Sequence, residues 1–126
     1  MDGINRQGIS IRPYRGVLRA SFSDAIVASS DNALIVQAPG AEPVYYIPLR
    51  DIYFEFLHRS DAPPRETPMG AATYWGVSAV GEAASDAMWV HETPAVGFEA
   101  LQDYGAFDPD KVLIETTDLP DPARTA

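Results

Sequence analysis

The residues of this sequence that suit acid–base or metal chemistry are few. The histidines are His58 and His91, and Asp61 and Glu92 are acidic residues close to them in the sequence. A histidine beside a carboxylate can move protons, because imidazole titrates near neutral pH. Neither histidine belongs to a cluster with metal-ligand spacing, so the sequence predicts no metal site and no cofactor. An enzyme that uses a histidine and a carboxylate as general acid and base is one hypothesis for the function.

Other catalytic patterns are absent from the sequence. The chain has no cysteine, which excludes disulfides, thiolate metal sites and a cysteine nucleophile. The segment 76–80 does not supply the Gly-x-Ser-x-Gly pattern of a serine nucleophile. No glycine-rich run follows a strand and opens a helix, so no phosphate loop is expected. Catalytic residues are therefore left unassigned, and so is the question of whether the protein is an enzyme.

Tyrosine and tryptophan side chains are concentrated on the segments that resemble strands. Buried rings of these types need a partner for their polar atom, so they are typical of core edges and of pocket walls. One interpretation is that they build the core of a small β domain. The other is an aromatic-lined pocket for a small ligand, next to the long loop 59–71. For this pocket we expect the residues Tyr46, His58, Asp61, Tyr74, Trp75, Trp89 and His91.

The elements that must position these residues are mainly short β-strands separated by turn residues. A single short helix is expected near residues 94–104, with Thr93 as N-cap and Phe98 and Leu101 on its apolar face. The fold class is mainly β, with compact antiparallel sheets of about eight short strands, and α+β is the alternative. The expected strands cover residues 17–22, 25–28, 33–37, 44–47, 52–58, 72–78, 88–91 and 112–115.

A chain of 126 residues corresponds to one domain. We expect an N-terminal lead-in over residues 1–15, a single β-rich domain over 16–117 and a flexible C-terminal tail over 118–126. Loop 59–71 is long for a compact domain, and such loops are usually functional or mobile.

The chain is acidic, with a formal net charge of −9 at pH 7. The four arginines among residues 1–20 are too widely spaced to form a basic patch. This balance argues against nucleic acid as a partner. No apolar run is long enough for a membrane span, and no signal-peptide pattern is evident at the N-terminus, so a soluble cytoplasmic protein is expected.

Several blocks of the sequence, taken in order, resemble a widespread bacterial and fungal family of unknown activity. They lie at residues 27–34, 43–52, 72–75, 87–89 and 104–107. The family is the domain-of-unknown-function family 427, also labelled nucleotidyltransferase-like. The resemblance spans about residues 16–115 and implies a compact β-rich domain, present here as a single copy.

The central loop departs from the pattern typical of this family. Positions that hold Ser, Asp, Gly, Ala, Tyr and Trp in the family are kept here as Ser60, Asp61, Gly70, Ala72, Tyr74 and Trp75. Positions that hold His, two Thr, Cys and Lys are occupied here by Ala62, Pro63, Pro64, Glu66 and Met69. The missing groups are the polar and nucleophilic ones on which chemistry in this loop would depend. The resemblance therefore implies that any loop-based reaction is lost or changed in this chain. Nucleotidyl transfer would also require clustered carboxylates and a phosphate-binding turn, which the sequence does not supply.

Three hypotheses for the function follow. The leading one is a binding or interaction module whose aromatic pocket accepts an unknown small molecule. The second is an enzyme that uses His58 or His91 with Asp61 or another acidic neighbour. The third is a structural homo-oligomer subunit, in which an exposed strand such as 52–58 pairs with its copy across a two-fold axis.

Overall fold

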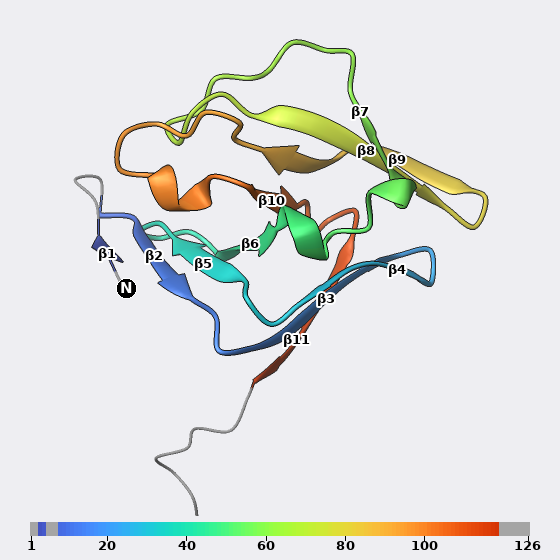
Figure 1. Ribbon diagram of the computed structural model, residues 1–126, viewed down its shortest axis with the longest axis horizontal. Coiled ribbons are helices and arrows are strands. Elements are labelled where there is room, and N and C mark those ends of the chain that lie inside the picture. The colour runs from blue at the N-terminus through green and yellow to red at the C-terminus, as the bar shows by residue number, and fades with distance from the viewer. Residues whose placement is uncertain (1–2, 5–7, 119–126) are drawn as a thin grey trace, which may run out of the picture.

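The described part of the chain, residues 3–4 and 8–118, forms eleven β-strands in two antiparallel sheets in the computed structural model (Figure 1). The mainly β fold class is thereby confirmed. The strands are β1 Gly3–Ile4, β2 Ser10–Pro13, β3 Gly16–Phe22, β4 Ala25–Ser30, β5 Leu34–Gln37, β6 Val44–Pro48, β7 Leu57–Arg59, β8 Thr73–Ala79, β9 Glu82–Val90, β10 Tyr104–Phe107 and β11 Leu113–Asp118.

The larger sheet has the strand order β1-β2-β5-β6-β10-β9-β8-β7, and the smaller sheet has the order β11-β3-β4. Figure 1 shows the three strands of the smaller sheet running together along the lower side of the molecule. Strands β3 and β4 follow one another in the smaller sheet. The chain then forms β5 to β10, which all belong to the larger sheet, and β11 returns to the smaller sheet.

Alternation of side chains explains why β3 lies between two layers. Leu18 and Ala20 are fully buried and face the larger sheet, whereas Arg19 between them is exposed. The chain then reverses into β4 through Ser23 and Asp24, whose φ angles of 50° and 67° are both positive. Two central residues with positive φ are the mark of a type I′ turn, whose twist suits a tight hairpin.

Two apolar cores cover the two faces of the larger sheet. The first lies between the sheets, where Leu18 and Val27 from the smaller sheet meet Ile47 and Met88 from the larger one. The second lies on the opposite face of the larger sheet. Its buried members are Val36, Tyr46, Phe98, Leu101 and Ala106, with Met69 and Trp89 packed against them.

The helix expected over residues 94–104 is wrong. This segment contains a single 3₁₀ turn, Glu99–Leu101, and Tyr104 already begins β10. Gly97 has a φ of 94°, which is outside the helical region and ends any helix that starts at Pro94. Phe98 and Leu101 are nevertheless buried, because a spacing of three residues also places two side chains on one side of a 3₁₀ turn.

The strand expected over residues 52–58 is only partly correct. Ile52 makes an isolated bridge to Ala28, and Phe54–Phe56 form a 3₁₀ turn before β7 begins at Leu57. A second 3₁₀ turn, Leu49–Asp51, precedes this segment. The alternation of Ile52, Phe54 and Phe56 therefore reflects packing against the first core rather than one continuous strand.

The expected lead-in, residues 1–15, and the expected tail, residues 118–126, were placed outside the β-rich domain. Strand β2 lies within the expected lead-in, and it pairs with β5 through four residue pairs from Ser10 to Pro13. Of the expected tail, Asp118 is the last residue of β11, and residues 119–126 lie outside the described residues.

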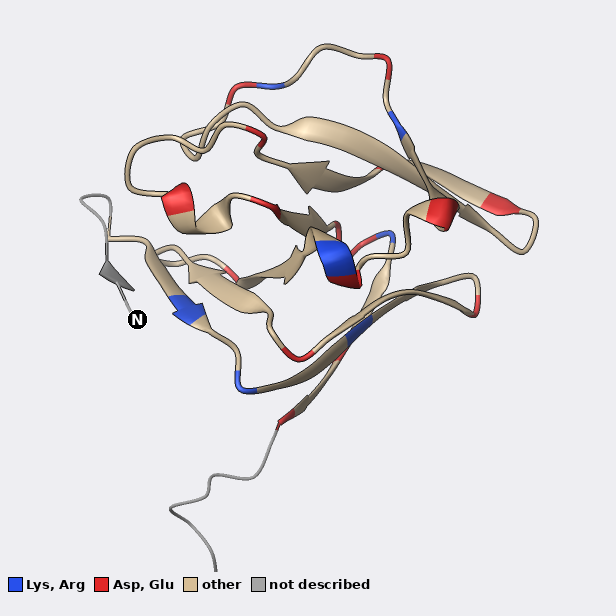
Figure 2. Cartoon of the chain, in the orientation of Figure 1, with Lys and Arg blue, Asp and Glu red and all other residues tan. Residues whose placement is uncertain are grey.

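Charged residues are distributed over both sheets and their connections, and acidic ones predominate at the turns and strand ends (Figure 2). In the described part of the chain, no helix is long and apolar enough to cross a membrane.

Candidate ligand-binding site

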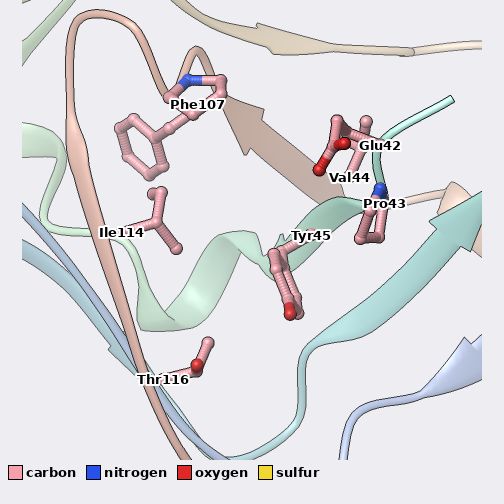
Figure 3. Close-up of a pocket in the computed structure, with 8 residues that line it drawn as sticks. Glu42, Pro43, Val44, Tyr45, Phe107, Ile114 and Thr116 are labelled. Atoms are coloured by element: carbon pink, nitrogen blue, oxygen red, sulfur yellow. The ribbon is translucent and has the colours of Figure 1, made fainter.

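A cavity of about 260 Å³ lies between one end of the neighbouring strands β6 and β10 of the larger sheet and strand β11 of the smaller one. We call it the intersheet cavity. Its walls come from the loop before β6, from β6, from the end of β10 and from β11 (Figure 3). The lining residues are Glu42, Pro43, Val44, Tyr45, Phe107, Pro109, Ile114 and Thr116.

The loop between β5 and β6 holds Glu42 at the edge of this cavity. Pro39 and Gly40 form its turn, which is closed by a 3.2 Å hydrogen bond from the Ala41 amide to the Ala38 carbonyl. Gly40 has a φ of 72°, as the third position of a type II turn requires. The Gln37 side chain donates hydrogen bonds to the carbonyls of Ala38 and Ala41 and so braces the loop from within.

Strand register explains why Phe107, Ile114 and Thr116 face the same cavity. Ile114 and Thr116 pair with Ala20 and Leu18, so their side chains lie on the same face of the smaller sheet as these two buried residues. Ile114 is half-buried there, and Thr116 is exposed at the edge of the cavity. Phe107 ends β10 and is 3% exposed.

The turn after β10 then carries the chain from one sheet to the other. It is fixed by the Asp108 carboxylate, which accepts a 2.9 Å hydrogen bond from the Asp110 amide, and by Lys111, which donates to the Ser85 carbonyl. The wall formed by β11 is therefore held in place at its beginning.

Polar groups lie at two ends of the cavity. Figure 3 shows the Glu42 carboxylate at one end and the hydroxyls of Tyr45 and Thr116 at the other, with Phe107 and Ile114 along one side.

The hydroxyl end is supported by Tyr14. The ring of Tyr14 meets that of Tyr45 edge-on at 5.6 Å, and its hydroxyl donates a 2.6 Å hydrogen bond to Asp118. Burial raises the pKa of Tyr14 and the bond to Asp118 raises it further, whereas a hydrogen bond with Thr116 lowers it. Tyr14 thus keeps its proton at neutral pH and remains a donor to Asp118.

Four of the seven residues expected in the pocket do come together, but in the second core. Tyr46, Trp89 and His91 are joined by hydrogen bonds, and Tyr74 lies beside Trp89 with ring centroids 6.1 Å apart. Trp89 is the cross-strand partner of Tyr74 on β8 and of Ala106 on β10, so these side chains lie on one face of the sheet. None of the seven expected residues is among those that line the intersheet cavity.

Hydrogen bonds around Tyr46 have a defined direction. The nitrogen Nδ1 of His91 lies 3.2 Å from the Gly70 carbonyl, which can only accept, so Nδ1 carries the proton in the neutral ring. The other nitrogen, Nε2, then accepts from the Tyr46 hydroxyl at 3.0 Å. The Tyr46 oxygen in turn accepts from Trp89 Nε1 at 3.0 Å. This chain pairs every polar atom of the buried Tyr46 and His91 side chains.

Burial controls the protonation of both residues. It raises the pKa of Tyr46 to about 12, although the hydrogen bond from Trp89 opposes this change. Burial also lowers the pKa of His91, while contacts with the carbonyls of Gly70 and Ala71 act in the opposite direction. At neutral pH both side chains are therefore uncharged and buried. This is the arrangement of a structural hydrogen-bond network.

The long loop is folded onto this network. Arg65 and Ala72 exchange two backbone hydrogen bonds, and the Ala95 amide donates to the Met69 carbonyl. The sulfur of Met69 lies 3.9 Å from the Tyr46 hydroxyl oxygen. The Arg65 guanidinium lies 4.2 Å from the centre of the Tyr74 ring and is paired with Asp86 at 2.7 Å. The second half of this loop is therefore part of the packed structure.

The remaining three expected residues lie elsewhere. Trp75 is on the opposite face of β8, where its ring packs edge-on against Phe54 at 5.1 Å. His58 is exposed and lies over Gly76, its cross-strand partner. Asp61 is exposed in the loop after β7.

The groups considered for acid–base or metal chemistry are likewise separated in their contacts. His91 is buried against Tyr46 and Gly70, whereas Glu92 points to Arg59 in an ion pair of 3.1 Å. Within the described residues, no group of three or more His, Asp or Glu side chains is arranged to hold a metal ion.

A second hollow, of similar volume, is more open and more polar. It is lined by Val17, Ser29, Ser30, Asp31 and Asp51. The Ser30 hydroxyl donates a 2.6 Å hydrogen bond to Asp51 and accepts one from the Asn32 amide. Because these groups already bind one another and the walls offer little apolar surface, the intersheet cavity is the stronger candidate for a ligand.

The sequence contained a usable signal for Glu42 and Tyr45, and it was missed. Gln37, Pro39 and Gly40 mark a tight turn between two strands, and the residues just after such a turn lie at the rim of the sheet. Phe107 and Ile114 carried no comparable signal, because their meeting depends on β11 joining the other sheet.

The state of His91 predicts a pH dependence of stability. The ordinary histidine pKa of 6.5 applies to the unfolded chain, and the folded protein holds the pKa of His91 below it. Between these two pKa values the unfolded chain binds more protons than the folded protein does. The free energy of unfolding therefore falls as the pH decreases below about 6.5, and it levels off below the folded-state pKa.

Urea unfolding at a series of pH values measures this dependence of the free energy of unfolding on pH. We expect His91→Gln, which keeps an acceptor for Tyr46 but does not titrate, to reduce the slope, and the exposed control His58→Gln to preserve it. Equal slopes for the His91→Gln and His58→Gln variants would contradict the assignment.

The fold and the site define a small two-sheet β domain with an apolar cavity between its sheets. The chain belongs to the family described as domain of unknown function DUF427, labelled NTP_transf_9, whose model matches residues 10–118. The resemblance found in the sequence blocks is thereby confirmed. No curated protein shows a significant sequence match to this chain.

Proposed function

We propose that this domain binds a small, largely apolar molecule in the intersheet cavity. The observation that carries the proposal is the cavity of about 260 Å³, lined mainly by apolar and aromatic side chains, with polar groups at its two ends. Most small-molecule sites in proteins combine apolar walls with a few oriented polar groups.

The construction of the walls supports this proposal. Tyr45, Phe107 and Ile114 all belong to strands, whose backbones are fixed by pairing with their neighbours. The loop backbone just before Glu42 is held by a braced turn. A site on such elements is preorganised, which lowers the entropy cost of ligand binding.

The binding hypothesis is favoured over the other two by the same geometry. The lining of the cavity includes no histidine, so a histidine-based reaction has no group there to carry it. The strand over 52–58, through which subunits were expected to pair, is largely replaced by a 3₁₀ turn. Ligand binding between the sheets needs neither feature.

Blocking the cavity tests the proposal. We expect 2-phenylethanol, used as a neutral probe, to cause saturable shifts in NMR resonances of residues around the cavity. Ile114→Trp places a larger ring in the cavity and should abolish these changes. Leu113→Trp is the matched control, because Leu113 is on the same strand, faces outward and is 59% exposed; this variant should bind the probe as the parent does.

The result that overturns the proposal is an absence of saturable binding, or equal binding to the Ile114→Trp and Leu113→Trp variants. If Ile114→Trp does not fold, as judged by circular dichroism, the smaller replacement Ile114→Phe serves in its place and should weaken binding.

A further inference from the structure

The intersheet cavity also has a charge preference. Of its eight lining residues, all within the described part of the chain, Glu42 is the one with a charged side chain. Figure 3 shows its carboxylate beside Val44, with Phe107 on the opposite side of the cavity. Glu42 is exposed, so a ligand that fills the apolar part of the cavity places one of its ends near a solvent-accessible carboxylate.

We infer that the ligand is a compact organic amine, with an apolar or aromatic body between Phe107, Ile114 and Tyr45 and a protonated amino group at Glu42. This inference rests on the proposed function, and it adds the chemical class of the ligand. The N–H groups of an ammonium ion donate hydrogen bonds to carboxylate oxygens, and its positive charge is attracted to their negative charge.

The aromatic walls favour the same ligand class. The rings of Phe107 and Tyr45 offer apolar surface to the organic body of such a ligand. A bare inorganic cation is a poor alternative, because it binds through several oxygen ligands and gains nothing from apolar walls. An anionic ligand would place like charges together at Glu42.

The charge of the whole chain acts in the same direction. A formal net charge of −9 produces a negative potential that attracts cations and repels anions before they reach the site. The braced turn adds local order, because the Gln37 side chain holds the carbonyls of Ala38 and Ala41 just before Glu42.

The test compares three probes of similar size that differ in charge: phenethylamine, 2-phenylethanol and phenylacetate. Dissociation constants are measured by NMR titration with the full chain. We expect the amine to bind up to about fivefold more tightly than the alcohol, the range of a solvent-accessible ion pair, and phenylacetate to bind most weakly. High salt should reduce the advantage of the amine.

Two charge-matched variants locate the preference. Glu42→Gln should lower the ratio of amine to alcohol affinity most of the way toward one, since it removes the carboxylate and keeps the size of the side chain. Glu82→Gln removes the same charge from an exposed position at the start of β9 and should leave the ratio unchanged.

The outcomes separate the two proposals. If the alcohol binds but the amine has no advantage, or if Glu82→Gln removes the advantage as fully as Glu42→Gln does, the amine inference is overturned and the binding function stands. If none of the three probes binds, the proposed function itself is overturned.

Discussion

Replacing Gly70 with alanine is expected to lower the free energy of unfolding by about 3–4 kcal/mol. Gly70 has a φ of 113°, a conformation that side-chain-bearing residues rarely adopt. A Cβ atom at this position would also lie 2.7 Å from the Thr93 carbonyl oxygen and 3.1 Å from the Pro94 Cα. Both neighbours are backbone atoms, so they cannot move aside without shifting the chain.

The expected loss is large because Gly70 joins three parts of the second core. Its carbonyl accepts hydrogen bonds from the Thr67 hydroxyl at 2.6 Å and from His91 Nδ1. The preceding residue, Met69, packs in this core, and its carbonyl accepts a hydrogen bond from the Ala95 amide. A displacement at Gly70 therefore disturbs the loop, the histidine and the segment after β9 together.

Gly40→Ala is the control for this experiment. Gly40 also has a positive φ, 72°, but a Cβ built there meets nothing within 4 Å. Its replacement should cost only the backbone term of about 1–2 kcal/mol. Urea unfolding of both variants measures the difference. Equal losses would show that the close approach to Thr93 and Pro94 has no energetic consequence.

Most of the strands were predictable from the sequence, since strand patterns and turns are local. The alternation in β3, with Leu18 and Ala20 inward and Arg19 outward, can be read directly from the residues. The segment 94–104 could not be resolved in this way. Phe98 and Leu101 are spaced as in a helix, but the packing of both against the larger sheet is achieved by one 3₁₀ turn after Gly97.

The candidate site was less predictable than the fold, because it depends on which face of a strand points where. Tyr45 and Tyr46 are neighbours of the same class, yet one lines the intersheet cavity and the other is buried in the second core. Composition does not distinguish them. The opposite wall requires β11 to leave the larger sheet and pair with β3, and this long-range pairing has no local signal.

Met69 in the central loop has a structural role. The sequence resemblance implied a lysine at its position, whereas the Met69 side chain packs against the second core near Tyr46. An apolar side chain at this position adds to the cover over Tyr46 and His91. The second half of this loop therefore covers the second core.

Tyr46→Phe is expected to lower the free energy of unfolding by about 1–3 kcal/mol, although it removes a single oxygen atom. That oxygen accepts from Trp89 Nε1 and donates to His91 Nε2, so its removal leaves a donor and an acceptor unpaired at the same place. His91 is 1% exposed, which prevents water from replacing the lost bond without opening the core. The loss should therefore exceed that of one exposed hydrogen bond.

Tyr45→Phe is the matched control, because it makes the same chemical change one residue away on the other face of β6. The hydroxyl of Tyr45 lies at the edge of the intersheet cavity, so we expect its removal to change stability by no more than about 0.5 kcal/mol. Urea unfolding at pH 7.5, where His91 is neutral in folded and unfolded chains alike, compares the two variants without a contribution from protonation. A similar small effect in both would mean that the Trp89–Tyr46–His91 chain contributes little to the fold, and that burial alone holds His91 in its neutral form.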